Sequence, residues 1–121
     1  MLAHRLFHVA TAFFVLGVGL GIFMGARQDF RLMHVHAHLN LLGWVALGLI
    51  GLLYMCRPQL QHGWMPQAHF WLHSVGLVVF MGGFAWSRLS DTFHKAPVAA
   101  GASMVGLGVL LFGVHVWRRL R

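Results

Sequence analysis

Four uncharged segments of about twenty residues each divide this chain of 121 residues. A helix rises about 1.5 Å per residue, so each segment is long enough to cross a hydrocarbon core about 30 Å thick. The sequence therefore predicts an all-α fold, an integral membrane unit of four helices. The predicted spans are Leu6–Ala26, Val35–Met55, Ala68–Ser87 and Val98–Trp117.

The composition agrees with a membrane protein. Charged residues make up 9% of the chain, whereas a soluble domain carries about 25%. Nine Lys and Arg against two Asp and Glu can indicate nucleic-acid binding, but these charges lie between the apolar segments and form no stripe. We interpret them as topology signals and lipid-headgroup contacts, and we expect no nucleic-acid partner. Cys56 is the only cysteine, which excludes an intrachain disulfide and a Cys-rich zinc site.

Short connections separate the spans, so we expect residues 1–121 to form a single transmembrane domain. The first span is too long for a typical signal-peptide core and should stay attached. With four spans, both termini lie on one side of the membrane, and the positive-inside rule favours the cytoplasm for that side by one residue. The side of the termini carries Arg5, Arg57, Arg118, Arg119 and Arg121, and the other side carries Arg27, Arg31, Arg88 and Lys95.

Small residues at four-residue spacing predict where helices approach closely. Gly17, Gly21 and Gly25 form two overlapping GxxxG steps in the first span, and Ala102 and Gly106 repeat the spacing in the fourth. Such surfaces let helix backbones come together in lipid, although glycine is also simply common in membrane helices. We expect both sets to mark helix contacts.

Ten histidines fall into two groups at opposite membrane faces. His34, His36 and His38 lie at the entrance of the second span, with His94 in the loop on the same side. We place His38 and His73 at levels roughly 15 Å apart, so a metal site must be built within one group. The group on the side of the termini contains His4, His8, His62, His69, His73 and His115.

The spacing His34-x-His36-x-His38 suggests ligands directed to two sides of one helix. Ionisable groups inside a span are functional by default, and imidazole is a common ligand of iron, copper and zinc. On a helix that turns about 100° per residue, His34 and His38 share a face while His36 points nearly the other way. A single zinc centre needs ligands that converge on one point, whereas this spacing suits a helix between two flat cofactors.

The segment His36-Ala37-His38-Leu39-Asn40-Leu41-Leu42-Gly43-Trp44 resembles the tenth helix of the haem-copper oxidase catalytic subunit, a family that includes the nitric oxide reductases. In that family a His-x-His pair near the outer end of this helix binds one haem with each histidine. His38–Leu42 is also similar to the second helix of the nitric oxide reductase large subunit, whose histidine ligates the low-spin haem. Small four-span bacterial proteins described as oxidase subunit I-like contain similar stretches. Those stretches correspond to Val35–Tyr54 and His69–Gly76.

The resemblance implies one arc of a haem-copper oxidase-like arrangement in a bacterial inner membrane, with haem b held by His36 and His38. No Cys-x-x-Cys-His motif is present, so the haem would not be covalently attached. The chain also departs from the family, because it has four spans instead of twelve and lacks the further histidine motifs of the copper site. Tyr54, the only tyrosine, lies at the far end of the second span, and no span carries a carboxylate for proton relay. Haem binding carries over more readily than oxidase chemistry.

Each candidate near the second span has a plainer alternative. His36 and His38 could be interfacial side chains hydrogen-bonded to backbone or lipid, although we favour haem ligation. His34 shares the face of His38 but is shallower, which makes it a weaker ligand candidate. Asn40 could bind a haem propionate, although we favour a role in helix packing.

The candidates at the other face are weaker. His69 and His73, at positions i and i+4, share a face and could hold copper or zinc together with His8 or His4. Interfacial polar caps explain this pair equally well. Two further histidines are expected to be solvated, namely His94 and His115.

Three functions remain open at this point. The first is a b-type haem protein that transfers electrons or binds a diatomic gas such as NO or O2. The second is a small oxidase or nitric oxide reductase with a second metal, such as copper. The third is a non-haem metal carrier or an accessory subunit. We favour an electron-transfer haem protein over a complete enzyme, and its redox partner stays open.

The resemblance also predicts a homotrimer. The oxidase fold looks like three arcs of four helices around a pseudo-threefold axis, and this chain would supply one arc. His36 of one copy and His38 of its neighbour would then meet across each interface. This arrangement would give three bis-histidine haems per trimer, and closed symmetry is usual for homo-oligomers.

Overall fold

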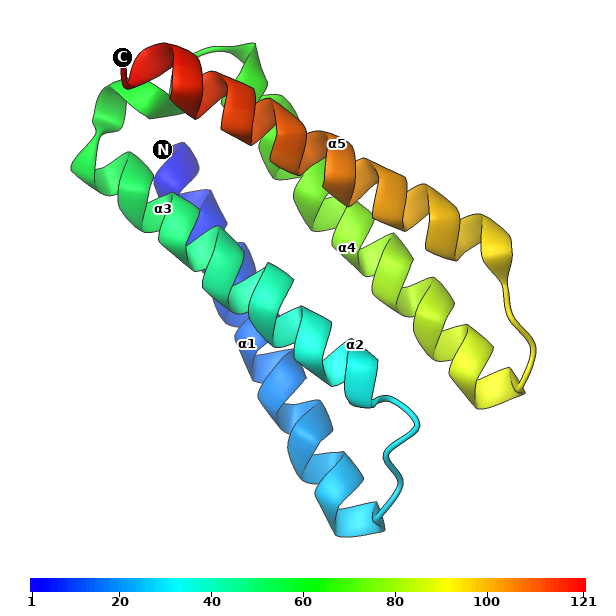
Figure 1. Ribbon diagram of the computed structural model, residues 1–121. Helices are drawn as coiled ribbons and strands as arrows, with labels where there is room; N and C mark the ends of the chain where they lie inside the picture. Colours follow the sequence, from blue (N-terminus) through cyan, green and yellow to red (C-terminus); the bar gives the residue numbers. More distant parts are fainter.

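The computed structural model describes residues 1–121 as four long helical rods, with no strands (Figure 1). The second rod is a composite of three consecutive helical segments that include a π-helix, η1. A short 3-10 turn, η2, connects the second rod to the third. The elements are α1 (Leu2–Arg27), α2 (Met33–His38), η1 (Leu39–Ala46), α3 (Leu47–Cys56), η2 (Pro58–Gln61), α4 (Trp64–Ser90) and α5 (Lys95–Arg119).

All four rods are long and apolar enough to cross a membrane, which confirms the predicted all-α fold with four spans. Each predicted span lies inside one rod, but every rod extends beyond it. α4, for example, begins at Trp64 rather than at Ala68. The additional turns contain Trp, His and Arg, which lower the hydropathy without interrupting the backbone hydrogen bonds. Hydropathy therefore marks the apolar part of each helix and not its ends.

The rods form two antiparallel hairpins (Figure 1). α1 packs along α2, η1 and α3, and α4 packs along α5. The hairpins meet mainly where α4 contacts α2 and η1. Both chain termini and η2 lie at one end of the molecule, and the loops after α1 and α4 lie at the other end (Figure 1).

Glycine allows the tight packing of the α4–α5 hairpin. A Cβ atom added at Gly76 would lie 2.7 Å from the Cβ of Met104, and one added at Gly83 would lie 2.7 Å from the Cβ of Pro97. Gly101 of α5 lies against the backbone of Phe80 in the same way. Larger side chains at these positions would force the two helices apart.

The predicted small-residue contacts are confirmed in one place and wrong in another. Gly17 and Gly21 lie against the second rod, but Gly25 has open space around it. In α5, Gly106 also has open space, and the close positions are Gly101 and Gly108 instead. The helices of the α4–α5 hairpin meet through glycines seven residues apart, so the four-residue spacing identified the wrong face of α5.

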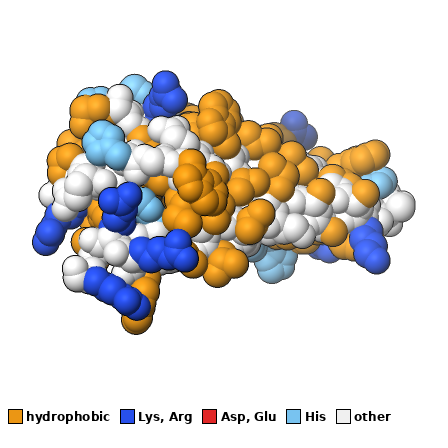
Figure 2. Space-filling model, turned by 90° about the horizontal axis from the view of Figure 1, so that it is seen from above, with side chains coloured by type: hydrophobic (Ala, Val, Ile, Leu, Met, Phe, Trp, Pro, Cys, Tyr) orange, Lys and Arg blue, Asp and Glu red, His pale blue; other side chains and the backbone are white.

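Charged side chains lie toward the ends of the rods, and apolar side chains cover much of the length between them (Figure 2). The two acidic residues, Asp29 and Asp91, both lie at the end opposite the termini. The Arg31 guanidinium donates to both carboxylate oxygens of Asp29, with an Nη2–Oδ2 distance of 2.8 Å. These hydrogen bonds, with one from the Arg31 backbone N–H, lower the pKa of the exposed Asp29 carboxyl.

Candidate histidine site between the hairpins

His36 is held against α1 by its own ring. Its Nδ1 lies 2.6 Å from the carbonyl oxygen of Gly17. A carbonyl oxygen only accepts hydrogen bonds, so Nδ1 must carry the proton. In the neutral ring, Nε2 is then unprotonated and keeps its lone pair free for a metal.

Two glycines of α1 create the space for this ring and for the neighbouring Asn40 side chain. A Cβ atom added at Gly21 would lie 2.7 Å from Cε1 of His36, and one added at Gly17 would lie 2.6 Å from Nδ2 of Asn40. The Asn40 side-chain amide donates to the His36 carbonyl oxygen at 2.9 Å. Asn40 therefore supports the backbone of its own rod through this hydrogen bond, and the predicted packing role is seen in its contact with Gly17 of α1.

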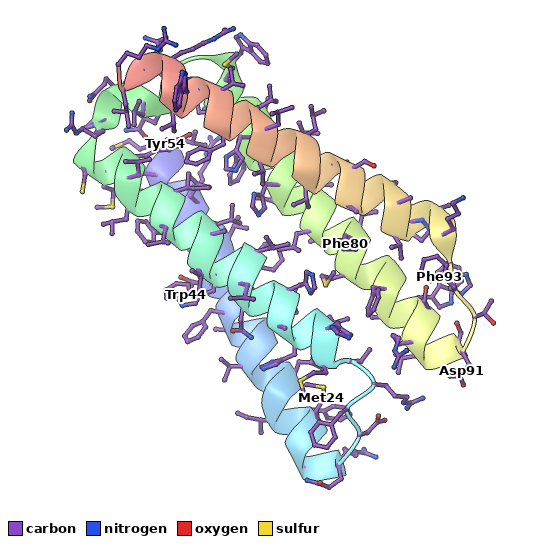
Figure 3. All side chains as sticks on the ribbon, viewed as in Figure 1. Met24, Trp44, Tyr54, Phe80, Asp91 and Phe93 are labelled. Atoms are coloured by element: carbon purple, nitrogen blue, oxygen red, sulfur yellow. The ribbon has the colours of Figure 1, made fainter.

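His38 is oriented by a hydrogen bond of the same kind. Its Nδ1 lies 2.7 Å from the carbonyl oxygen of His34, one turn earlier on the same helix. The proton again belongs on Nδ1, and Nε2 keeps its lone pair. The ring meets that of Phe80 on α4, labelled in Figure 3, edge to face with 5.7 Å between the ring centroids.

The His38 ring lines a groove of about 260 Å³ between α2 and α4, which we call the His34–His38 groove. His34 also lines this groove, and its ring meets that of Phe84 edge to face with 5.9 Å between the ring centroids. His36 does not line this groove, because its ring faces α1 on the other side of α2. The predicted division of the three histidines between two faces of the helix is thus confirmed. The groove is lined by His34, His38, Phe80, Met81 and Phe84.

Both histidines have the hydrogen-bond pattern of metal ligands. A ligating histidine almost always donates its other ring N–H to a carbonyl or carboxylate, which fixes the ring and its tautomer. Backbone carbonyls do this for His36 and for His38. Each ring therefore keeps an unprotonated Nε2, and the two rings lie on opposite sides of α2.

A feature that the sequence analysis missed is the π-helix η1, which begins directly after His38. π-helical turns are rare and often occur at functional sites. The Asn40 side chain competes for the His36 carbonyl at this point, and such competition loosens the α-helical hydrogen-bond pattern. The wider turn also brings Gly43 against Phe13 of α1, where an added Cβ would lie 2.5 Å from the Phe13 Cβ.

His69 and His73 are buried in the protein core, which rules out their interpretation as interfacial polar caps. His73 Nε2 lies 2.9 Å from the Leu42 carbonyl oxygen and must donate to it. His73 Nδ1 then accepts from His69 Nε2 at 3.2 Å. This order leaves His69 Nδ1 as a buried acceptor without a partner.

The suggested copper or zinc site at this pair gains no third ligand. His4 and His8 are exposed, and no group of three or more His, Cys, Asp or Glu side chains is placed to hold a metal. The estimated separation of His38 and His73 was also too large. His73 precedes Phe80, the contact of His38, by seven residues on α4, or about 10 Å along the axis. α4 begins at Trp64 rather than at Ala68, so His73 lies further from the start of its helix than predicted.

Three other predicted positions can be compared with the structure. His115 was expected to be solvated, but it is buried and its Nε2 donates to the Leu60 carbonyl at 2.7 Å. His94 is partly buried and stacks on Trp86, with 3.6 Å between the ring centroids. Tyr54 lies at the end of the molecule that carries the termini, far from His36 and His38 (Figure 3).

The chain is 24% identical, over 153 aligned residues, to the cbb3-type cytochrome c oxidase subunit CcoN1 of Stutzerimonas stutzeri. The similarity covers 97% of this chain but only 32% of that subunit, so the chain spans about a third of its length. No family model matches the chain, and no solved structure matches it. The similarity, together with the four apolar helices, supports a distant relation to haem-copper oxidase subunits.

Proposed function

We propose that this chain is a membrane b-type haem protein in which His36 and His38 provide the axial ligands. The observation that carries the proposal is the matched pair of hydrogen bonds at Nδ1, which leaves Nε2 free on both rings. The distant similarity to an oxidase subunit and the membrane-length helices agree with it. A bound haem would supply one-electron redox chemistry.

The opposite directions of His36 and His38 support a shared site. One chain cannot bring both rings to a single iron, but two neighbouring copies can. The His34–His38 groove, at about 260 Å³, is smaller than the 300–1,000 Å³ or so of typical ligand sites, and it is open at the surface. A second copy of the chain, packed against this groove, would enclose a haem there. Because the chain resembles one of three arcs in the oxidase fold, we infer that the copies form a homotrimer with three bis-histidine haems.

The role that fits this ligation best is electron transfer. An iron with two imidazole ligands is six-coordinate and low-spin, and it has no open position for oxygen.

Copper is not part of the proposal, because His69 and His73 offer only two metal ligands and are hydrogen-bonded to each other. We place the chain in a bacterial inner membrane because its relative is a bacterial oxidase subunit. We place both termini in the cytoplasm because the face that contains them carries one more Lys or Arg than the opposite face.

Haem content of single-histidine variants tests the assignment. His36→Ala and His38→Ala should each lose the sharp bands of the reduced-minus-oxidised spectrum. His94→Ala should retain them, because His94 stacks on Trp86 away from the groove. Full haem content with unchanged bands in both of the first two variants would exclude this site.

Carbon monoxide distinguishes a saturated iron from an open one. With both axial positions occupied, the intact reduced protein should bind little carbon monoxide on the timescale of mixing. Rapid, stoichiometric binding would contradict bis-histidine ligation and would favour a gas-binding haem protein.

A further inference from the structure

The end of the molecule that carries the termini contains a second, polar pocket of about 210 Å³. It lies where the beginning of α4 meets the last turn of α5. Its ionisable lining is entirely basic and consists of His62, His115, Arg118 and Arg119, which we call the terminal basic pocket. None of these residues belongs to the proposed haem site.

The pocket has a buried, hydrogen-bonded wall and an exposed cationic rim. His115 is 4% exposed and is anchored by its hydrogen bond to the Leu60 carbonyl, so it cannot swing away. Arg118 and Arg119 are exposed side chains in the last turn of α5. An Arg guanidinium binds a phosphate with two parallel hydrogen bonds, and two adjacent arginines can do so from two directions.

The N-terminus of α4 adds to the positive potential. Its N-cap residue, Gly63, also lines the pocket, and no side chain caps the helix there. The first backbone N–H groups of a helix lack internal partners and lie at the positive end of its dipole, which favours anions. The helix end and the arginines therefore favour the same kind of ligand.

No acidic side chain competes for these cations. Asp29 and Asp91 are the only acidic residues of the chain, and both lie in the loops at the opposite end. Arg31 shows the contrast, because its guanidinium is already paired with Asp29. The groups of the terminal basic pocket have no such internal counter-ion.

The location of the pocket identifies the source of the anion. Trp64 lines the pocket and Trp117 precedes its arginines, and these rings are 65% and 71% exposed. Exposed tryptophans at the ends of membrane helices mark the level of the lipid headgroups. A basic pocket between helix ends at this level is suited to an anionic headgroup.

We propose that the terminal basic pocket binds the phosphate of an anionic phospholipid. Its volume equals that of about seven liquid waters at ~30 Å³ each, which is enough for a phosphate group and part of its glycerol. The acyl chains of the lipid would lie along the exposed apolar surface of α5. The site is independent of the haem, so either proposal can fail alone.

Native mass spectrometry of delipidated protein tests this site with dioleoyl phosphatidylglycerol and dioleoyl phosphatidylcholine as probes. The wild-type chain should bind the first lipid at least about tenfold more tightly than the second. The double variant Arg118→Gln/Arg119→Gln should lose most of this preference. The matched control, Arg27→Gln/Arg88→Gln, removes the same charge at the opposite end and should keep it. Circular dichroism checks that both variants fold, and if the first does not, each single Gln variant should lose at least about threefold in affinity.

Three outcomes would overturn the proposal. One is a wild-type chain without preference for the anionic lipid. Another is an equal loss in both double variants, which would indicate diffuse charge attraction rather than a pocket. The third is displacement of the lipid by inorganic phosphate at millimolar concentration, which would mean that the site takes free phosphate.

Discussion

At the scale of single residues, the position of His36 depends on the absence of a side chain at Gly21. An added Cβ would lie 2.7 Å from Cε1 of the His36 ring, which is shorter than a van der Waals contact, so the ring would have to move. We predict that Gly21→Ala lowers haem content severalfold without loss of helicity. The measurement is haem per chain from the optical spectrum, with circular dichroism as the check on folding.

Gly25→Ala is the matched control for this prediction. Gly25 lies one turn further along α1, and nothing lies within 4 Å of an added Cβ. Its haem content should equal that of the wild type. Equal haem content in the Gly21 and Gly25 variants would show that the fit of His36 against α1 has no part in binding haem.

At the scale of helices, the α4–α5 hairpin depends on the contact of Gly101 with the backbone of Phe80. Backbone atoms cannot turn aside as a flexible side chain can, so an added methyl group must separate the helices. Gly101→Ala should lower the free energy of unfolding by about 1–3 kcal/mol, the usual cost of overpacking. Titration with sodium dodecyl sulfate in mixed micelles measures this change.

Gly106→Ala tests whether the effect arises from packing. Gly106 lies on the same helix with open space around it, and alanine is the better helix former. Its free energy of unfolding should stay the same or rise. A loss equal to that of Gly101→Ala would point to the backbone of α5 rather than to its contact with α4.

The sequence was sufficient to predict the four helices but not to predict which of their faces are in contact. Apolar runs of membrane length predict spans directly, and the alternation of His34, His36 and His38 predicts their opposite directions. Helix contacts depend on which faces meet, and this requires the register between helices. For that reason the four-residue spacing pointed to Gly106, whereas Gly101 makes the contact.

The burial of polar residues was equally hidden from the sequence. The positions of His69, His73 and His115 near the ends of apolar spans predicted that all three lie at one membrane face. In the structure their partners are the carbonyl of Leu42, the neighbouring histidine and the carbonyl of Leu60. The two carbonyl partners lie 31 and 55 residues away in sequence, so no local pattern reveals them, whereas the i and i+4 spacing of His69 and His73 did place those two rings on one face.

At the scale of the whole molecule, the two hairpins form an open unit. They meet mainly through α4, α2 and η1, and the His34–His38 groove between them is exposed. Our account predicts that copies close this unit in a threefold arrangement. Native mass spectrometry in mild detergent should show three chains with three haems. A monomer that holds one haem would contradict the trimer.

The central claim is that each iron joins His36 of one copy to His38 of the next, and mixed trimers test it most directly. A chain with His36→Ala keeps His38, and a chain with His38→Ala keeps His36. In any cyclic trimer that contains both chains, one of the three interfaces brings an intact His36 to an intact His38.

Co-expression of the two variants with different tags allows these mixed trimers to be purified. The reduced-minus-oxidised spectrum should then show low-spin haem at about one third of the wild-type amount, because one of three interfaces is complete. Each variant expressed alone should show none. A mixed trimer with no more low-spin haem than the single variants would contradict the shared site.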